Sequence, residues 1–528
     1  MTDIVKLNNL LGKKAFRIFI FIAVLLVVSM PRLIDLNHPS FTYDETLDYL
    51  NSVKYCNHMD LTRPVAEGYL NAQLPFTVSC FFYRVLGQHE WAARFVSVIF
   101  SLLTICAAFL IANRLFGYWW ATMTALLLGL CPFYISSSRL AFSHGHIFSN
   151  IFIMLGLYAL LKILNKGGRS LYLYAALSAF SLGLGVGSDL LASFWVLNIF
   201  IILLYENRKA PWEVQINTVM IFLVAAYIGS FIASPMYSFH LFQAKDSVLA
   251  RLKFWDEAIW YSWLGKLVRE IPANYYLVVA LVKFSPVISL LAFLTIILYA
   301  VRFKAFDPFC RYLIFCFWPI IYLSFKPWKS PYYLTAFIPA GYILITYTLT
   351  VLFKTKLLTS NKLLKIILLL LIIGSQIYYI IQMHPDYLMQ GIHYGEKFYG
   401  EFQGPAVSNG QWIGEAFEFI KKDSGAEGPS ILIFQGLSAP QIKYYANKYD
   451  LKDIAMNIPQ KTDTETASRI DYVVLNQDAK RIFSPFHKLA IRDNRRLISF
   501  LEDSKEYRIV KTFSSGGFPM VWVYKRSR

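Results

Sequence analysis

Residues 91–113 read WAARFVSVIFSLLTICAAFLIAN, and Arg94 is the one charged side chain among these 23 residues. An apolar stretch of about 17–25 residues is long enough to cross the hydrocarbon core of a bilayer as a helix. Comparable stretches recur along the first 384 residues, near 16–31, 117–136, 145–164, 171–188, 189–206, 215–236, 274–301, 310–325, 331–353 and 363–384. The sequence therefore predicts an α-helical polytopic membrane protein with about eleven transmembrane helices.

The composition agrees with this prediction and excludes two other classes of protein. The chain of 528 residues is 56% hydrophobic and only 16% charged, which is more apolar surface than a soluble protein of this size buries. Its 43 Phe, 34 Tyr and 12 Trp residues are the opposite of a disordered composition. A soluble multidomain enzyme and an intrinsically disordered chain are therefore both excluded.

The net charge of +18 has a spatial explanation. In a soluble protein such a charge would suggest a nucleic-acid partner. Residues 385–528 hold 20 basic and 17 acidic side chains, whereas residues 1–384 hold 31 basic and 16 acidic ones. Because the excess belongs to the membrane part, we expect membrane lipids and no nucleic acid as partners.

The basic residues also predict the orientation of the chain. With the N-terminus inside, 17 of them fall on short inner loops, as the positive-inside rule expects for cytoplasmic segments. The stretch 73–87 is short and carries Pro75 and Arg84, so we interpret it as a helix at the membrane interface. The first span lacks a small-residue cleavage site and is expected to remain as an anchor. We therefore predict a cytoplasmic N-terminus and an extracytoplasmic tail.

This orientation divides the chain into two parts. Residues 1–384 form the expected transmembrane domain, with two long outer loops at 32–90 and 237–273. Residues 385–528 form a small soluble α/β domain, because strand-like and helix-like patterns alternate there. We expect strands at 431–434, 472–475, 508–512 and 520–524, and helices around 440–447 and 494–501.

The six cysteines do not form a disulfide framework, since most lie inside apolar stretches and the tail has none. Cys56 and Cys80 are the exception, because both lie in or beside the first outer loop. They pair if that segment faces an oxidising space, but spacing alone leaves the geometry open.

Two adjacent acids, Asp44 and Glu45, follow the first span in the stretch Phe41–Thr46. Neighbouring carboxylates raise each other's proton affinity, and such pairs serve as a general base, as metal ligands or as both. An ordinary solvated pair in a loop is the alternative.

The order of the motifs after this acid pair adds a family resemblance. The motifs are Gly68–Pro75 (GYLNAQLP), Leu86–Arg94 (LGQHEWAAR), Arg114–Gly117 (RLFG), Ser138–His144 (SRLAFSH), Lys283–Pro286 (KFSP) and Ser324–Lys329 (SFKPWK), the last followed by Tyr332, Tyr333 and Pro339. His384-Pro385 then leads into the tail. This order resembles the membrane glycosyltransferases that use polyprenyl-phosphate sugars, the family of the dolichyl-phosphate-mannose protein mannosyltransferases and the bacterial aminoarabinose transferases, whose fold is called GT-C.

The resemblance implies a fold and a reaction. The expected fold is GT-C, and the expected enzyme takes a sugar from a polyprenyl-phosphate donor at the outer face of a prokaryotic cytoplasmic membrane. By this resemblance Asp44 acts as the base on an acceptor hydroxyl in a single inverting displacement, and Glu45 positions the acceptor, the phosphate or a cation. If the acceptor is an already ionised phosphate, Asp44 has only an electrostatic or metal role. The acceptor itself is a lipid, a glycan or a protein.

A lipid phosphate at this depth requires cations, and the chain supplies several on the expected outer side. The candidate donor-phosphate ligands are Arg94, Arg139, Lys283, Lys326, Lys329 and Tyr332. Lys283 lies within a span, where a cation is costly unless it is paired or faces a cavity. Arg94 and Arg139 suit bidentate phosphate binding, although snorkelling to the headgroups is the alternative for both. For Lys326 and Lys329 the alternative is an ordinary loop lysine.

Two departures from the family pattern concern metal binding. His144 stands where relatives often have an Asp, and His146 follows it, so a divalent metal ion is a candidate cofactor. A hydrogen-bonded histidine at a helix start is the alternative. Asn71–Leu74 (NAQL) replaces the basic or histidine-containing Pro-Pro-Leu motif of the family. Asp189, at an expected outer turn, is either a loop acid or a sugar-contacting residue.

Other functions remain as alternatives at this point. A multi-pass transporter or flippase of a lipid-linked sugar would also suit many spans with intramembrane cations, but its repeated halves and matched broken spans are not apparent in the sequence. A membrane scaffold does not explain the acid pair or Lys283. The aromatic and basic stretch 239–270 predicts an interfacial amphipathic helix, which either covers the donor site or only anchors the chain.

Overall fold

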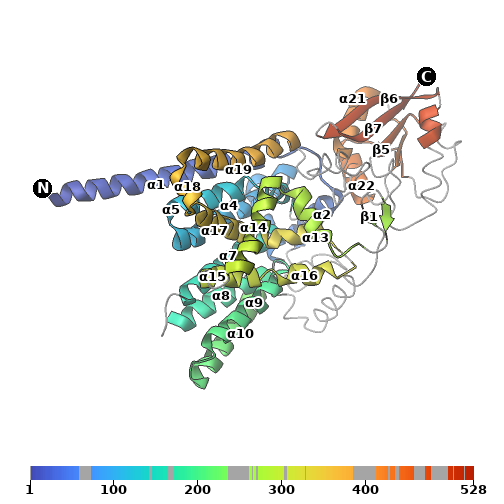
Figure 1. Ribbon diagram of the computed structural model, residues 1–528. Coiled ribbons are helices and arrows are strands. Elements are labelled where there is room, and N and C mark those ends of the chain that lie inside the picture. Colours follow the sequence, from blue (N-terminus) through green and yellow to red (C-terminus); the bar gives the residue numbers. More distant parts are fainter. Residues whose placement is uncertain are drawn as a thin grey trace.

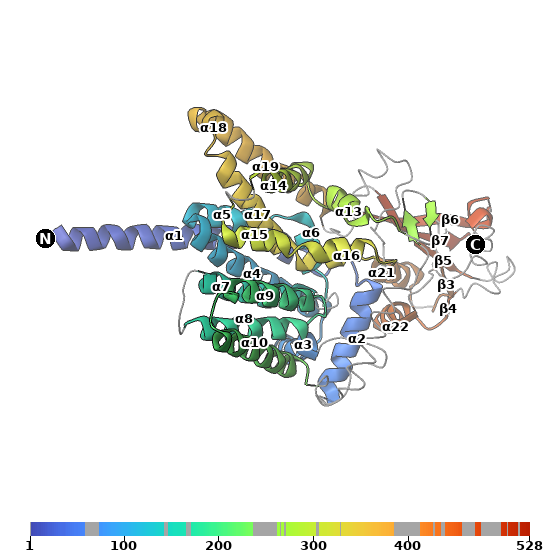
Figure 2. The same cartoon turned by 60° about the horizontal axis from the view of Figure 1, so that its bottom comes forward.

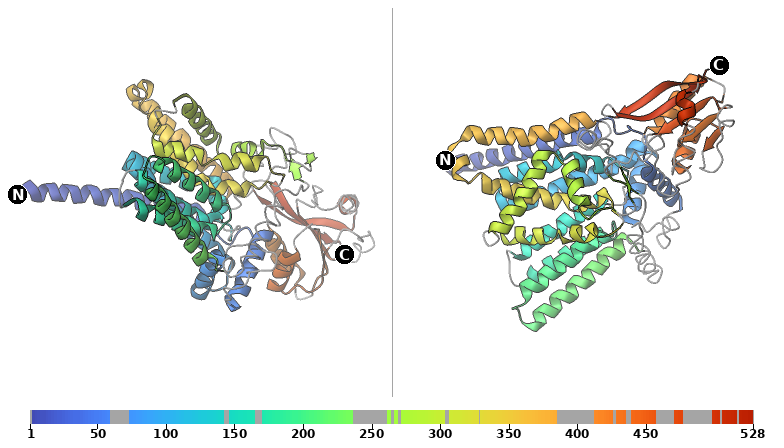
Figure 3. Two further views of the ribbon diagram at one scale, coloured as in Figure 1. Left: turned by 90° about the horizontal axis from the view of Figure 1, so that it is seen from below. Right: turned by 45° about the vertical axis from the view of Figure 1, so that its right-hand side comes forward.

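The computed structural model shows a helical body with a five-stranded sheet at one end (Figure 1). It describes residues 2–58, 73–141, 146–164, 170–235, 261–263, 266–268, 271–302, 306–327, 329–384, 412–425, 428–434, 439–456, 470–476, 498–503, 505–515 and 518–527. The N-terminus of α1 (Thr2–Leu33) and the sheet lie at opposite ends of the molecule in every view (Figures 1, 2 and 3). We call the end that carries the sheet the sheet end.

Helices dominate the described part of the first 384 residues. After α1 come α2 (Tyr43–His58), α3 (Gln73–Leu86), α4 (Glu90–Phe116), α5 (Tyr118–Gly129), α6 (Pro132–Ser138), α7 (His146–Leu164), α8 (Ser170–Val186), α9 (Ala192–Asn207), α10 (Trp212–Ala233), α13 (Tyr275–Lys283), α14 (Pro286–Arg302), α15 (Pro308–Phe315), α16 (Trp318–Ser324), the 3-10 helix η3 (Pro331–Ala336), α17 (Ile338–Leu352), α18 (Lys356–Ser360) and α19 (Lys362–Met383). The predicted helical polytopic fold is confirmed.

Five of the described helices are long and apolar enough to cross a membrane, or six if the bent pair α5 and α6 forms one span. Five further apolar helices are shorter, at Ser170–Val186, Ala192–Asn207, Pro286–Arg302, Pro308–Ser324 and Ile338–Leu352. Large apolar side chains of α10, α14 and α19 are exposed, as expected of helices that face lipid. The number of eleven spans stays a prediction.

Proline divides several stretches that the sequence analysis takes as continuous spans. The stretch 117–136 bends by 64° between α5 and α6, where Pro132 starts the second helix. Pro286 starts α14 and separates it from α13 in the same way. Proline has no backbone N–H to donate and fits only the first turn of a helix, so each of these helices begins anew at its proline. The broken helices therefore correct the prediction of continuous spans at these positions.

Small residues let two of the outer helices approach closely. A Cβ added at Gly183 of α8 would lie 2.2 Å from the carbonyl oxygen of Ala226, and one at Gly229 of α10 would lie 2.2 Å from that of Phe180. Only glycine allows this backbone contact between α8 and α10, as is common between membrane helices. The two helices run side by side along the edge of the helical body (Figure 2).

The stretch 239–270 differs from its prediction as an interfacial helix. Near the end of this stretch, the described residues form two short antiparallel strands, β1 (Tyr261–Trp263) and β2 (Lys266–Val268). Residues 236–260 lie outside the described part of the chain. Residues 261–263 and 266–268 therefore form paired strands and not the predicted helix.

The tail contains the predicted α/β fold. Its strands are β3 (Ile431–Phe434), β4 (Ile454–Met456), β5 (Tyr472–Asn476), β6 (Tyr507–Ser515) and β7 (Phe518–Arg526), in the order β4-β3-β5-β7-β6. The central strand β5 pairs parallel with β3 and antiparallel with β7. Helices α21 (Ile413–Ser424) and α22 (Ala439–Lys448) accompany the sheet, and residues 498–503 are helical. Each strand and helix expected from the sequence has a counterpart, whereas β4 and α21 were not anticipated.

One apolar core joins the tail to the helical body. Phe41, Tyr49 of α2 and Val96 of α4 belong to the same buried cluster as Phe417 of α21 and Val474 of β5. Helix α2 lies beside α22 at the sheet end (Figure 2). The tail is therefore packed against the segment that leads into α2. Residues 385–411 lie outside the described part, so the domain boundary near 385 stays a prediction.

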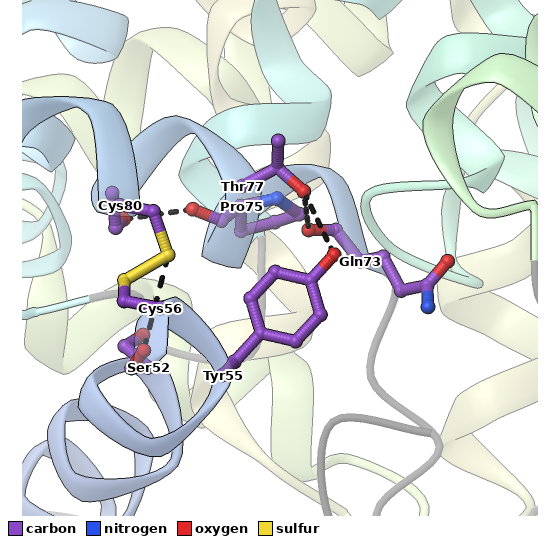
Figure 4. The surroundings of a disulfide bond; sticks show 8 residues. Ser52, Tyr55, Cys56, Gln73, Pro75, Thr77 and Cys80 are labelled. Carbon is purple, nitrogen blue, oxygen red and sulfur yellow. Dashed lines mark hydrogen bonds between the residues drawn. A yellow bond between two sulfur atoms is a disulfide. The ribbon is translucent and has the colours of Figure 1, made fainter. Parts of the chain in front are cut away.

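A disulfide bond joins α2 to α3. Cys56 and Cys80 are bonded, with their Cα atoms 5.2 Å apart (Figure 4). Next to the bond the Tyr55 hydroxyl lies 3.3 Å from that of Thr77, which connects the same two helices. The pairing that the sequence left open is therefore present in the structure.

Candidate functional site

The start of α2 is built by a capping box. The Thr42 hydroxyl oxygen accepts a hydrogen bond from the Glu45 amide at 3.1 Å, and the Glu45 carboxylate accepts one from the Thr42 amide at 2.9 Å. This reciprocal pair satisfies two donors that a helix start otherwise leaves unpaired. Thr42-x-x-Glu45 therefore determines where α2 begins, and it places Asp44 in the first turn.

Glu45 also forms a buried ion pair with Arg94 of α4. The guanidinium donates two hydrogen bonds to the carboxylate, at 2.7 Å from Nε and 2.9 Å from Nη2. Only 1% of the Glu45 side chain and 4% of the Arg94 side chain are exposed. The backbone amide of Ala141 donates a further bond to Glu45 at 2.9 Å. Glu45 thus ties α2 to α4 and to the end of α6.

Two arginines bind the backbone of the segment that precedes α2. Arg94 donates from Nη1 to the carbonyl oxygens of Leu36 and Pro39, at 2.9 and 2.7 Å. Arg139, at the end of α6, donates to five carbonyls of the same segment, those of Pro31, Arg32, Ile34, Asp35 and His38, at 2.7–3.2 Å. These two predicted phosphate ligands therefore hold residues 31–39 in place by contacts with backbone carbonyls.

Asp44 is the acid of the pair that stays accessible. It is the second residue of α2 and is partly exposed, whereas its neighbour Glu45 is buried. A carboxylate in the first turn is stabilised by the partial positive charge of the helix N-terminus. The predicted acid pair therefore has two different environments, one buried and one partly exposed.

The tail clamps the same segment from the other side. The Glu415 carboxylate of α21 accepts from the Ser40 amide at 2.8 Å, and the Ser40 hydroxyl oxygen accepts from the Gly414 amide at 3.1 Å. Gln441 of α22 donates to the Phe41 carbonyl at 2.5 Å. We call these contacts with residues 38–41 the tail clamp. They hold the chain four residues before Asp44.

A tyrosine of α22 connects the tail clamp to the start of α4 through hydrogen bonds. The Phe41 amide donates to the Tyr445 hydroxyl oxygen at 2.6 Å, and that hydroxyl donates to the Glu90 carboxylate at 3.3 Å. Glu90 also accepts from Lys448 at 2.5 Å and from the Tyr444 hydroxyl at 3.2 Å. Burial raises the pKa of Tyr445, so its phenol stays protonated and keeps donating.

The tail clamp contains one group that titrates near neutral pH. His38 Nδ1 lies 3.1 Å from the Glu415 carboxylate, and this hydrogen bond raises the pKa of His38 above its ordinary value of 6.5. A raised pKa means that the contribution to stability is complete below pH 6.5 and is lost as the pH rises through the folded value.

We expect wild-type protein to lose a little more thermal stability between pH 6 and pH 8 than His38→Gln does. Because 53% of the His38 side chain is exposed, the difference should correspond to only about 0.2–1 kcal/mol. Melting temperatures of the two purified proteins at both pH values measure it. Equal pH dependence in wild type and variant would show that the pair contributes nothing.

A second polar pair connects α7 to the turn before α9. His146 Nδ1 lies 2.5 Å from the Asp189 carboxylate, and both side chains are buried. Asp189 also accepts from the Leu191 amide at 3.1 Å, and the His146 ring packs edge-on against Tyr333 of η3. The structure thus brings His146 and Asp189 together, whereas His144 lies outside the described residues.

The candidate lysines lie on elements around η3. Lys329 is buried and donates to the carbonyls of Ile271 and Lys326, at 2.8 and 2.5 Å. Lys326 lies over the Tyr322 ring at 5.2 Å. Lys283, also buried, ends α13, which packs on η3 and α16, and Tyr332 of η3 is partly exposed. Helices α13 and α16 both lie toward the sheet end (Figure 2).

Element η3 links the lysines to the acid and arginine cluster. Thr335 of η3 lies 3.2 Å from the Ser137 hydroxyl of α6, and its carbonyl accepts from Asn150 of α7 at 3.1 Å. Arg139 directly follows α6. The described candidate residues therefore lie on helices and turns that contact one another near the sheet end.

A cavity lies beside this cluster, and Asp44 is not among the residues that line it. It has a volume of about 950 Å³ and lies between residues 37–40, the start of α4, and helices α21 and α22. Its wall includes the tail clamp residues Ser40 and Glu415 together with Glu90 and Trp91.

Metal binding is not resolved by the described residues. Within them, no three His, Cys, Asp or Glu side chains are grouped so that they would hold a metal ion. His144 and the stretch 236–260 lie outside the described part of the chain. A divalent cofactor therefore stays a prediction.

The sequence analysis did not identify the residues of the tail clamp. Glu415, Gln441 and Tyr445 lie about 400 residues from the segment that they hold, and they follow no motif. Arg32, whose guanidinium donates to the carbonyls of Val28 and Gly129 at 2.6 Å each, was also missed. The Thr42-x-x-Glu45 capping box is a local pattern that indicates the start of α2, but it was not recognised in the sequence.

Comparison with known families agrees with this architecture. Residues 74–239 match the family model described as dolichyl-phosphate-mannose-protein mannosyltransferase. The matched region, about a third of the chain, spans α3 to α10 and so includes Arg94, Arg139, His146 and Asp189. No curated protein matches the chain significantly.

Solved structures match nearly the whole chain. ArnT from Cupriavidus metallidurans bound to undecaprenyl phosphate is 14% identical, with 96% of this chain and 97% of that one covered and a TM-score of 0.55. The apo form of the same protein is also 14% identical, covers 97% and 98%, and has the same TM-score. The similarity extends over the helical body and the tail alike, and it shows a common fold.

Proposed function

We propose that the chain is a membrane glycosyltransferase of the GT-C fold, and that it transfers a sugar from a polyprenyl-phosphate carrier to an acceptor at the outer face of the cytoplasmic membrane. The observation that carries this proposal is the environment of Asp44. It is a partly exposed carboxylate at the start of α2, in a segment held by buried arginines on one side and the tail clamp on the other.

In the proposed reaction Asp44 is the general base. Its carboxylate accepts the proton of an acceptor hydroxyl while the hydroxyl oxygen attacks the anomeric carbon of the donor sugar. The bond from that carbon to the phosphate oxygen breaks, and polyprenyl phosphate leaves with the bonding electrons. One displacement inverts the configuration of the sugar. An acceptor that is already an ionised phosphate would need no base, and Asp44 would then act only electrostatically.

The remaining candidates take different roles in this proposal. Glu45, Arg94 and Arg139 act as positioning residues, because Glu45 pairs with Arg94 and both arginines donate to backbone carbonyls before Asp44. We assign the leaving phosphate to Lys283, Lys326 and Tyr332 near η3, since cations stabilise the charge that develops on the phosphate. Lys329 supports that turn through the carbonyls of Ile271 and Lys326.

Two observations support a polyprenyl-phosphate sugar as the donor. ArnT from Cupriavidus metallidurans, which shares the fold, binds undecaprenyl phosphate. A polyprenyl phosphate keeps its chain in the bilayer and presents its head at the surface, which suits cations at the ends of apolar helices. The transporter alternative is set aside, because both the family model and the shared fold belong to transferases.

The cysteine pair supports the outer orientation of the site. Disulfides persist in oxidising compartments, and Cys56–Cys80 joins α2, which carries Asp44, to α3. The short loops rich in basic residues at the other end support a cytoplasmic N-terminus.

We therefore expect a membrane-impermeant maleimide to leave Cys56 and Cys80 unlabelled in intact spheroplasts and to label them once a reductant has been added. Cys80→Ser should expose Cys56 to the reagent without any reductant. Labelling of that variant only after the membrane is permeabilised would place α2 on the cytoplasmic side and contradict the proposed orientation.

The function as a whole is tested by the glycans of the producing cell. We expect mass spectrometry of lipid, polysaccharide and protein fractions to show one species that lacks a sugar when the gene is deleted or carries Asp44→Asn. Unchanged glycans in all three fractions of the deletion strain would overturn the proposed function.

A further inference from the structure

The proposed reaction does not use the cavity between the tail and the helical body. Its wall is formed by residues of the segment before α2, of the start of α4, and of α21 and α22. Its volume of about 950 Å³ falls within the range of sites that bind small molecules and oligosaccharide-sized ligands.

We propose that this cavity binds the glycan portion of the acceptor, so that the enzyme extends a carbohydrate chain. The inference rests on the proposed function and adds to it the class of the acceptor. The tail then has a direct role in substrate recognition, because α21 and α22 form half of the cavity wall.

The chemistry of the wall suits a neutral sugar chain. Trp91 lies against the ring of His89, with centroids 6.2 Å apart and planes only 15° from parallel, and Tyr444 of α22 also lines the cavity. Aromatic faces of this kind bury the apolar C–H surface of a sugar ring. Glu418, Lys443 and Asn447 line the same space and offer donors and acceptors to sugar hydroxyls.

The same wall disfavours the two other acceptor classes. The carboxylates of Glu90, Glu415 and Glu418 line the cavity together with Lys443 and Lys448, so the lysines do not outnumber the acids as a site for a phosphorylated lipid headgroup would require. A peptide in extended form binds best along the edge of a sheet, whereas the tail presents helices to this cavity. A glycan is therefore the class that the described lining favours.

The cavity is preformed by buried polar contacts. Glu90 is 8% exposed and is bound by Tyr444, Tyr445 and Lys448, which fixes α22 against the start of α4. Glu415 fixes α21 against Ser40. A site held in this way loses little conformational freedom when a ligand binds.

The cavity is also within reach of the proposed base. Ser40 forms part of its wall, and Asp44 follows four residues later. Four residues span at most about 14 Å between Cα atoms. A sugar chain seated in the cavity therefore needs to extend by only a few residues to present a hydroxyl to Asp44.

The test compares transfer with acceptor-independent hydrolysis in purified full-length protein. The donor is the polyprenyl-phosphate sugar fraction of the producing cells, and the acceptor probe is envelope polysaccharide from a strain that lacks the enzyme. The variants are Trp91→Ala and Asn447→Ala, both in the wall, with Trp91→Phe as the conservative variant. Trp119→Ala is the matched control, because Trp119 is 60% exposed on α5, far from the sheet end (Figure 1).

We expect wild type to transfer sugar to the polysaccharide, and Trp91→Ala to raise the acceptor KM about tenfold. Asn447→Ala should raise it several-fold, since one hydrogen bond is lost. Trp91→Phe should recover most of the affinity, Trp119→Ala should match wild type, and slow release of polyprenyl phosphate to water should be unchanged in all four.

Two results overturn the inference while leaving the proposed function intact. One is that wild type releases polyprenyl phosphate but transfers no sugar to polysaccharide. The other is that both cavity variants keep the wild-type acceptor KM. If wild type releases no polyprenyl phosphate from the donor fraction under any condition, the proposed function itself fails, and the inference fails with it.

Discussion

Asp44→Asn is expected to lower sugar transfer by about 10²–10⁴-fold while the protein is still made and inserted in the membrane. The amide keeps the size of the side chain but no longer accepts the proton of the acceptor hydroxyl. Asp44 is partly exposed in the first turn of α2, so the substitution should leave the fold intact. The rate of transfer by purified protein, with donor saturating, measures the effect.

Two variants serve as controls for this loss. Asp35→Asn removes a negative charge from the same segment, and Asn tolerates the positive φ of 51° found at that position. Its partner is His384 at 2.9 Å in a largely exposed pair, so activity should stay close to wild type. Asp44→Glu keeps a carboxylate and should retain part of the activity. Full transfer by Asp44→Asn would exclude Asp44 as the base.

Arg94→Met should destabilise the protein by about 3–5 kcal/mol, because it leaves the Glu45 carboxylate buried without its ionic partner. The change also removes the hydrogen bonds to the Leu36 and Pro39 carbonyls, so the segment before Asp44 should be less well held. A lower melting temperature of the purified protein, together with reduced transfer, is the expected result.

The matched control for this prediction is Arg114→Met. Arg114 lies on the same helix α4, but it is exposed and near its other end, so its replacement should shift the melting temperature little. The double variant Glu45→Gln, Arg94→Met should recover part of the stability, because no unpaired buried charge remains. A melting temperature of Arg94→Met equal to that of Arg114→Met would contradict the structural role of the pair.

The sequence predicts the local parts of this molecule well, because their causes are local. The apolar stretch 91–113 falls within α4, and the expected strand 431–434 has the bounds of β3. The prolines at 132 and 286 were visible, yet the stretches around them were taken as unbroken spans. Hydropathy indicates whether a segment is apolar enough for the membrane. It does not show that a proline interrupts the backbone hydrogen bonds and divides the helix.

The candidate site was only partly predictable for a different reason. Glu45, Arg94 and Arg139 were all expected at the site, and in the structure Arg94 pairs with Glu45 while Arg139 binds the segment before α2. Their partners were not, because the choice between a phosphate and a backbone carbonyl depends on the tertiary fold. Arg139 was expected to bind a lipid phosphate, and in the structure it contacts five carbonyl oxygens.

The contacts of the tail with residues 40 and 41 could not be predicted from the sequence either. Its strands follow from alternating apolar residues, but no periodicity indicates that Glu415 and Tyr445 contact Ser40 and Phe41. Contacts across about 400 residues depend on how the two parts pack, and a single sequence carries no record of that packing. The structure thereby connects the tail to the segment that holds Asp44.

The most direct test of the account is turnover of a polyprenyl-phosphate sugar by the purified enzyme in lipid nanodiscs. We predict that wild type releases polyprenyl phosphate and that the transferred sugar has the opposite anomeric configuration from the donor. Asp44→Asn should do both about 10²–10⁴-fold more slowly. Release of polyprenyl phosphate by Asp44→Asn at the wild-type rate, or a product with retained configuration, would contradict it.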